Sequence, residues 1–134
     1  MARIEADELA AREARERLRS TPLTALQTDA LSAPLMQPDE DLLATRSGAI
    51  LIVPAGETLL SGGTVYLTSR RIVHAGRILV SIPLEQVREL SVGGERLLLT
   101  LDGGDGMSLD VDQPRLLRVE ISAAIAAFRA AQTS

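Results

Sequence analysis

The chain has 134 residues, which fits one domain of ordinary size, and 46% of them are hydrophobic. Only Tyr66 and Phe128 are aromatic, so the core must be aliphatic, and all 14 basic residues are arginine, which excludes lysine chemistry such as Schiff bases and Walker-type phosphate loops. The net charge is -4 and the arginines are spread along the chain, so the sequence indicates neither a nucleic-acid surface nor a polybasic membrane patch.

The absence of cysteine removes disulfides, thiolate nucleophiles and thiolate metal sites, and it is compatible with a reducing cytoplasm. The N-terminal residues mix acids and arginines and lack the apolar run of a signal peptide. The longest apolar runs fall far short of the roughly 20 residues that span a bilayer. We therefore expect a cytoplasmic location, including the inner face of the cytoplasmic membrane.

Residues 1–20 are predicted to form a charged helix with a thin apolar stripe. Ile4, Ala11 and Leu18 are seven apart, and Leu9 lies nearby in the sequence. Such a helix is marginal alone. We expect it to lie on the rest of this chain or on another molecule; the alternative is a solvated extension.

Residues 21–41 are predicted to be a linker or docking arm. Thr21 and Pro22 end the helix, and isolated apolar residues follow. These residues are Leu23, Leu26, Leu31, Leu35 and Met36. They are too many for an inert spacer, so they either pin the arm to a surface or bind a partner.

Residues 42–134 are predicted to form the globular domain, because short β-like runs separated by glycine and polar turns begin there. The candidate strands are 42–47, 49–53, 57–61, 64–68, 71–75, 78–84, 88–92, 96–101 and 106–111. Turns with suitable chemistry fall at 75–77, 92–95 and 102–106. The pattern indicates an antiparallel meander.

The last segment predicts an amphipathic helix. Asp112 and Gln113 are candidate N-caps, and Pro114 suits the first turn. One helical face carries Leu117, Ile121, Ala124, Ile125 and Phe128. The predicted fold class is therefore α+β, mainly β: about seven antiparallel strands, a C-terminal helix that covers the sheet, and an extra N-terminal helix.

The run GGTVYLTSRRIVHAGRILVSIPLEQVREL, residues 62–90, resembles the core of bacterial pleckstrin-homology-like and GRAM domains. In that family a strand ends in Leu-Thr-Ser/Asn-Arg-Arg and a later strand leads into Ile-Pro-Leu. The preceding VPAGETLL, residues 53–60, is similar to the family's entry. The resemblance covers about residues 49–130 and implies a bent seven-stranded sandwich or barrel capped by the C-terminal helix.

This scaffold hosts lipid binders, peptide binders and assembly modules, so the resemblance implies a fold more than an activity. Lipid-binding relatives usually carry lysines and arginines around the first hairpin, and the corresponding turn near residues 60–63 has none. The candidates for a replacement anion or lipid site are Arg46, Arg70, Arg71 and Arg77.

The adjacent pair Arg70 and Arg71 has three interpretations. Arg70 is exposed in a turn while Arg71 pairs with an acid; or the two form a docking face for an acidic partner; or long polar side chains shield the edge of the hairpin. We favour the third, in which the pair marks the fold.

His74 is the sole histidine, and the alternation of a strand places it with Ile72, opposite Val73 and Ala75. It lacks companions for acid–base or metal chemistry, and Ser69 has no identifiable orienting acid. We therefore expect a packing or surface role for His74.

The acidic stretch 102–112 suggests calcium through Asp102, Asp105, Asp110 and Asp112, but it fails the EF-hand template. A glycine-rich hairpin turn explains it better. We expect no metal and no cofactor.

We expect a non-catalytic interaction or assembly module that binds a protein partner or a second copy of itself, and not an enzyme. The candidate partner-binding residues are Ile4, Leu9, Leu18, Leu23, Leu26, Leu31, Leu35 and Met36. The alternative is peripheral binding to anionic lipid at the cytoplasmic face through the four arginines. Nucleic acid is not expected, since two aromatics offer little for base stacking.

Overall fold

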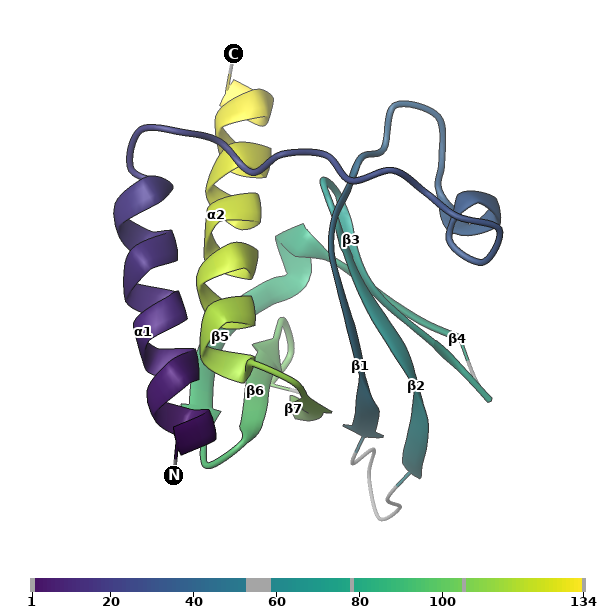
Figure 1. Cartoon of the computed structure of the whole chain (residues 1–134). Coiled ribbons are helices and arrows are strands. Elements are labelled where there is room, and N and C mark those ends of the chain that lie inside the picture. Colours follow the sequence, from purple (N-terminus) through teal and green to yellow (C-terminus); the bar gives the residue numbers. More distant parts are fainter. Residues whose placement is uncertain (1, 53–58, 78, 105, 134) are drawn as a thin grey trace.

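The computed structural model describes residues 2–52, 59–77, 79–104 and 106–133. Two helices lie side by side at one side of the molecule. The last strands of the sheet lie behind the C-terminal helix, and the first strands extend away from both helices (Figure 1). The elements are α1 (Ala2–Arg17), η1 (Ala33–Leu35), β1 (Leu42–Ile52), β2 (Leu59–Thr68), β3 (Arg71–Gly76), β4 (Leu79–Pro83), η2 (Leu84–Gln86), β5 (Val87–Gly93), β6 (Arg96–Leu101), β7 (Gly106–Val111) and α2 (Pro114–Thr133).

The strands form one antiparallel sheet of seven, in the order β4-β3-β2-β1-β7-β6-β5. The long strand β1 joins the two halves of the sheet: it pairs with β2 over Leu42–Ile52, and its last part, from Gly48 to Ile52, also pairs with β7. The two ends of the sheet are therefore β4 and β5, and each of these strands has one neighbour.

Strands β1 and β2 continue through their glycines, so the predicted breaks near Gly48 and Gly63 were wrong. Gly48 pairs with Gly63, and Gly63 pairs with Gly76, so the three glycines form one row across β1, β2 and β3. A Cβ atom at Gly48 would lie 2.5 Å from the carbonyl oxygen of Asp110, and one at Gly63 would lie 2.2 Å from that of Ala75. Close backbone approach requires these glycines, and the strands continue through them. Residues 53–58 of the predicted runs and of the VPAGETLL stretch lie outside the described residues.

One aliphatic core is enclosed by both halves of the sheet and by α2. Its fully buried side chains include Ile50, Leu67 and Ile72 from the first half and Leu97 and Leu109 from the second. The face of α2 predicted from its periodicity packs against this core, with Leu117, Ile121, Ala124, Ile125 and Phe128 in one cluster. The α+β, mainly β class is thus confirmed, as are the turns after β3, β5 and β6.

The first helix of the chain packs on α2. Ala11 and Ala14 are buried against Val119, with Leu18 and Leu116 partly buried beside them. The small alanine side chains let the two helices approach, and this contact supplies the surface that the weakly apolar α1 needs. None of the helices in the described ranges is both long enough and apolar enough to span a membrane.

Candidate interaction surface

The arm, residues 21–41, lies on the domain's own sheet along much of its length. Leu35 and Met36 are partly buried against Leu42, Tyr66 and Val73, which form the outer face of the first three strands. Leu23 packs against the main core. The backbone N–H of Leu26 donates to the carbonyl of Leu42 at 2.7 Å. Much of the arm's apolar surface is therefore used within the chain.

A buried ion pair fastens the end of the arm to the start of β3. The Glu40 side chain is fully buried, and its Oε2 accepts hydrogen bonds from Arg71 Nε at 2.9 Å and from Thr68 Oγ1 at 2.6 Å. Arg71 Nη2 also donates to the carbonyl oxygen of Leu35. Burial opposes ionisation, but the hydrogen bonds from Arg71, Thr68 and the backbone N–H of Gln37 outweigh it and lower the pKa of Glu40.

This pair decides among the three interpretations of Arg70 and Arg71. Arg70 is exposed, and Arg71 pairs with an acid, as in the first interpretation. The third interpretation, which we favoured, was wrong for Arg71, because its side chain binds Glu40 instead of shielding the edge of the hairpin. The acid is Glu40, which precedes Arg71 by 31 residues, and the buried geometry makes the pair structural. Thr68 Oγ1 accepts from both arginine backbone N–H groups, at 3.1 and 2.9 Å, and so shapes the turn.

A second ion pair connects β1 to α2. Arg46 Nη2 lies 2.5 Å from Glu120 Oε1, and the side chains are 13% and 14% exposed. Burial raises the pKa of Glu120, and the charges of Arg46 and Arg17 only partly offset it. Arg46 and Arg71 are thus engaged inside the molecule, while Arg70 and Arg77 are exposed. The four arginines proposed as an anion site therefore do not form an open cluster.

The eight candidate partner-binding residues separate into two groups. Leu9, Leu26 and Leu31 are exposed, at 51%, 46% and 77%. Ile4, Leu18, Leu23, Leu35 and Met36 are half-buried, and the last four of these pack against the chain's own clusters. Leu9 lies on α1, whereas Leu26 and Leu31 lie on the arm.

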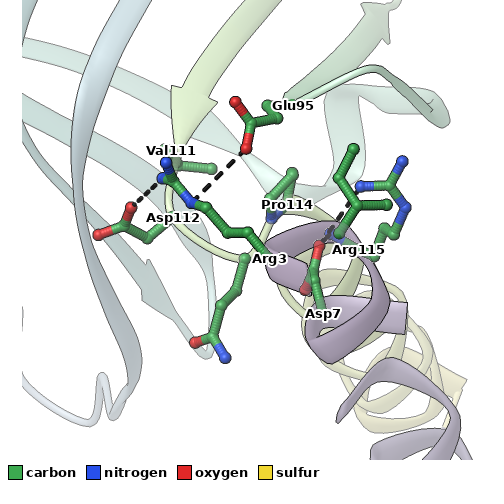
Figure 2. A pocket seen from close by; sticks show the side chains of 9 residues that line it. Arg3, Asp7, Glu95, Val111, Asp112, Pro114 and Arg115 are labelled. Atoms are coloured by element: carbon green, nitrogen blue, oxygen red, sulfur yellow. Dashed lines mark hydrogen bonds and ion pairs between the residues drawn. The ribbon is translucent and has the colours of Figure 1, made fainter. Parts of the chain in front are cut away.

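The N-terminus of α1 is anchored by ion pairs around a polar hollow of about 280 Å³ (Figure 2). Arg3 reaches Asp112 at 2.9 Å and Glu95 at 3.5 Å, and Asp7 lies beside Arg115 at 3.6 Å. Each of these five charged side chains has an oppositely charged neighbour within the group. These ion pairs therefore hold α1 in place, and the hollow presents no unpaired charge to a ligand.

His74 is buried, with 1% exposure. Its Nε2 lies 3.2 Å from the carbonyl oxygen of Gly48, which can only accept, so Nε2 carries the proton. Its Nδ1 has no hydrogen-bond partner among the described residues. Ile72 belongs to the core while Val73 and Ala75 belong to the outer cluster, as the alternation predicted. No described group of three His, Asp or Glu side chains is placed to share a metal ion.

Sequence reasoning missed a groove that runs between α1, α2 and β5. It consists of three adjoining hollows of about 330, 560 and 270 Å³, and Arg118 lines all three. Arginines from three elements gather here: Arg12, Arg15 and Arg19 on α1, Arg115, Arg118 and Arg129 on α2, and Arg88 on β5. Glu8 is the one carboxylate among the described lining residues. We call this the arginine groove.

The signal for this groove is present in the sequence only as helical spacing. Arg12, Arg15 and Arg19 follow one another by three and four residues, as positions on one helical face do. Arg115 and Arg118 do the same on α2. The two helices are separated by most of the chain. Their arginines are therefore dispersed in the sequence and lie close together only in the fold.

The end of the groove beside β5 has a mixed lining of apolar and charged side chains. Val87, Leu90 and Ile125 line its 270 Å³ end, with Arg88 and Arg129 among its other lining residues. Because β5 ends the sheet, its outer edge pairs with no other described strand. An edge strand offers backbone N–H and C=O groups to an incoming segment.

No family model matches the chain, and no curated protein matches it. Its fold is similar to the crystal structure of the C-terminal domain of an unknown protein from Leishmania infantum, with a TM-score of 0.51 and 17% identity over 69% of this chain and 87% of that one. At this identity the likeness shows a shared fold alone.

Proposed function

We propose that this chain is a non-catalytic protein-interaction module with a pleckstrin-homology-like body, and that it binds an extended partner segment along the edge of β5. The observation that carries the proposal is that the outer edge of β5, which pairs with no other described strand, lies beside a groove that β5 forms with α2. A polypeptide that adds a strand to such an edge gains backbone hydrogen bonds, while its alternate side chains enter the groove.

The pleckstrin-homology-like assignment is supported by the seven antiparallel strands and by the helix that follows β7, since the sequence resemblance implies seven strands capped by the C-terminal helix. The interaction role is further supported by the position of α1 and the arm. Both are packed on the domain, so a partner would meet a preformed groove rather than a free arm. Preformed sites lose less conformational entropy on binding.

The alternative role, contact with anionic lipid through Arg46, Arg70, Arg71 and Arg77, receives less support. Arg46 and Arg71 are bound to Glu120 and Glu40, so only two of the four remain exposed. Headgroup recognition needs several charge-assisted donors that converge on one spot.

The experiment that tests the proposal is selection of a random dodecapeptide library on the immobilised full-length protein, followed by affinity measurements of the enriched peptides. Ser122 is exposed on α2 and lines the groove, so Ser122→Trp would fill the groove without disturbing the core. Ser47→Trp, at an exposed position on β1, is the matched control.

We expect enriched peptides that bind the wild type and the Ser47→Trp variant alike and lose binding to Ser122→Trp. In addition, amide exchange of β5 should slow when peptide is bound, because its outer backbone groups become hydrogen-bonded. Enrichment of no peptide, or peptides indifferent to Ser122→Trp, would reject the proposed groove.

A further inference from the structure

We propose that the occupant of the arginine groove is an acidic polypeptide segment, whose carboxylates are bound by Arg12 and Arg15 of α1 and Arg118 of α2. This inference rests on the proposed function and names the chemistry of the partner. It also gives α1 a direct part in binding, although α1 lies outside the region of sequence resemblance.

Positive charge is concentrated in the arginine groove. The chain carries a net charge of -4, yet half of its 14 arginines line this groove. Arg12, Arg15, Arg118 and Arg129 make no ion pair with any described carboxylate. Concentrated charge of one sign within a concave surface attracts ligands of the opposite sign.

The arginines of α1 lie beside β5 in the groove. The middle hollow, of about 560 Å³, is lined by Arg12 and Arg15 on one side, by Arg118 from α2, and by Val92 from β5. A segment that paired with β5 would therefore have α1 and its arginines alongside it. Guanidinium groups bind carboxylates in bidentate geometry. We therefore expect Asp or Glu at the positions of the added strand whose side chains point toward α1.

The groove suits a polypeptide better than a lipid or a nucleic acid. The edge of β5 suits a polypeptide backbone, which lipid headgroups and nucleic acids lack. Tyr66 is buried, with 6% exposure, and Phe128 is half-buried against the core, so neither of the two aromatics is placed to stack on bases or to enter a bilayer interface. If these arginines bound a membrane or an RNA, the edge of β5 would take no part in the binding.

The test uses the dodecapeptide selection on the full-length protein, together with two matched double variants. Arg12→Gln with Arg15→Gln removes two charges from the groove, and glutamine keeps the helix propensity of α1. Arg70→Gln with Arg77→Gln removes two exposed charges near the two ends of β3, outside the groove's lining. Arg118→Gln tests whether α2 also contributes to binding the carboxylates.

We expect the enriched peptides to be rich in Asp and Glu and to bind more weakly as salt rises, since exposed charge pairs are screened. The Arg12→Gln, Arg15→Gln variant should bind them about tenfold more weakly, and Arg118→Gln should show a smaller loss. The Arg70→Gln, Arg77→Gln variant should bind as the wild type does.

The two proposals fail in different ways. Peptides without an acidic excess, lost with Ser122→Trp but unchanged by the Arg12→Gln, Arg15→Gln variant, would overturn the acidic partner and keep the β5 site. Enrichment of no peptide would overturn both. Binding to vesicles of phosphatidylcholine and phosphatidylserine that depends on Arg12 and Arg15, without peptide binding, would overturn both in favour of a membrane.

Discussion

Asp7 on α1 binds the first turn of α2 through the backbone of Leu116. Its Oδ1 accepts from the Leu116 N–H at 3.1 Å, and its Oδ2 accepts from the Arg115 N–H at 2.8 Å. The first N–H groups of any α-helix lack partners within the helix, and a carboxylate there also interacts favourably with the helix dipole. Asp7 is 4% exposed, so α1 supplies the cap for a helix that begins more than a hundred residues later.

We predict that Asp7→Ala lowers the free energy of unfolding by about 2 kcal/mol, because it leaves two N–H groups at a buried helix end without an acceptor. Urea unfolding measures the loss, and amide exchange should show faster opening of α1. Glu13→Ala, at an exposed position of the same helix, is the control and should change stability little. Equal losses in the two variants would contradict this role for Asp7.

Gly48 and Gly62 allow a second matched comparison within paired strands. We predict that Gly48→Ala destabilises the domain by about 3 kcal/mol or prevents its folding, because its Cβ would overlap the backbone of β7. A Cβ at Gly62 would meet nothing within 4 Å, so Gly62→Ala should be close to neutral. Thermal unfolding of both variants gives the comparison. A stable Gly48→Ala protein would refute the close approach of β1 and β7.

The Glu40 carboxylate should make stability depend on acid pH. Its pKa is lowered in the folded protein, so the unfolded chain binds more protons in the acid range, and stability rises with pH there. The contribution of Glu40 is present above its unfolded pKa of 4.5 and is lost as pH falls through the lower, folded value. We predict that Glu40→Gln lowers stability at neutral pH and weakens the rise of stability with pH in the acid range.

Urea unfolding from pH 3 to pH 7 measures that difference. Asp39→Asn, at the exposed neighbouring position, serves as the control for the loss of one carboxylate. If stability rises as steeply with pH in Glu40→Gln as in the wild type, other carboxylates produce the pH dependence.

The arm makes a testable contribution to stability. We predict that the double substitution Leu35→Ser, Met36→Ser costs about 2 kcal/mol, because it removes partly buried side chains from the outer face formed with Leu42, Tyr66 and Val73. Leu31 is 77% exposed, so Leu31→Ser should cost less than about 0.5 kcal/mol. Thermal unfolding distinguishes the two. If the double variant is as stable as the wild type, the arm is held by the Glu40 network alone.

Local pattern was sufficient for much of the fold. The periodicity of residues 114–133 predicted the face that α2 buries, the alternation around His74 predicted which neighbours share its side, and the turn residues located three connections. These properties depend on residues near one another in the chain, so the sequence displays them directly.

The places where sequence reasoning failed involve residues that are distant in the chain. Gly48 and Gly63 resemble strand breaks in sequence, and only their pairing reveals that the backbones pass too closely for a side chain. Asp112 and Gln113 were the local candidates for capping α2, whereas Asp7 performs that task. A hydrogen bond between such residues has no local signature, because it depends on how two helices meet.

The amino-acid sequence by itself determined the class of fold, the aliphatic nature of the core, the absence of lysine and cysteine chemistry, and the amphipathic face of α2. Which arginines form ion pairs within the chain depends on the tertiary fold. Charge acts through space over a few ångströms, so Arg46 and Arg71 are engaged by Glu120 and Glu40, while Arg12 and Arg118 meet across the groove only when α1 packs on α2.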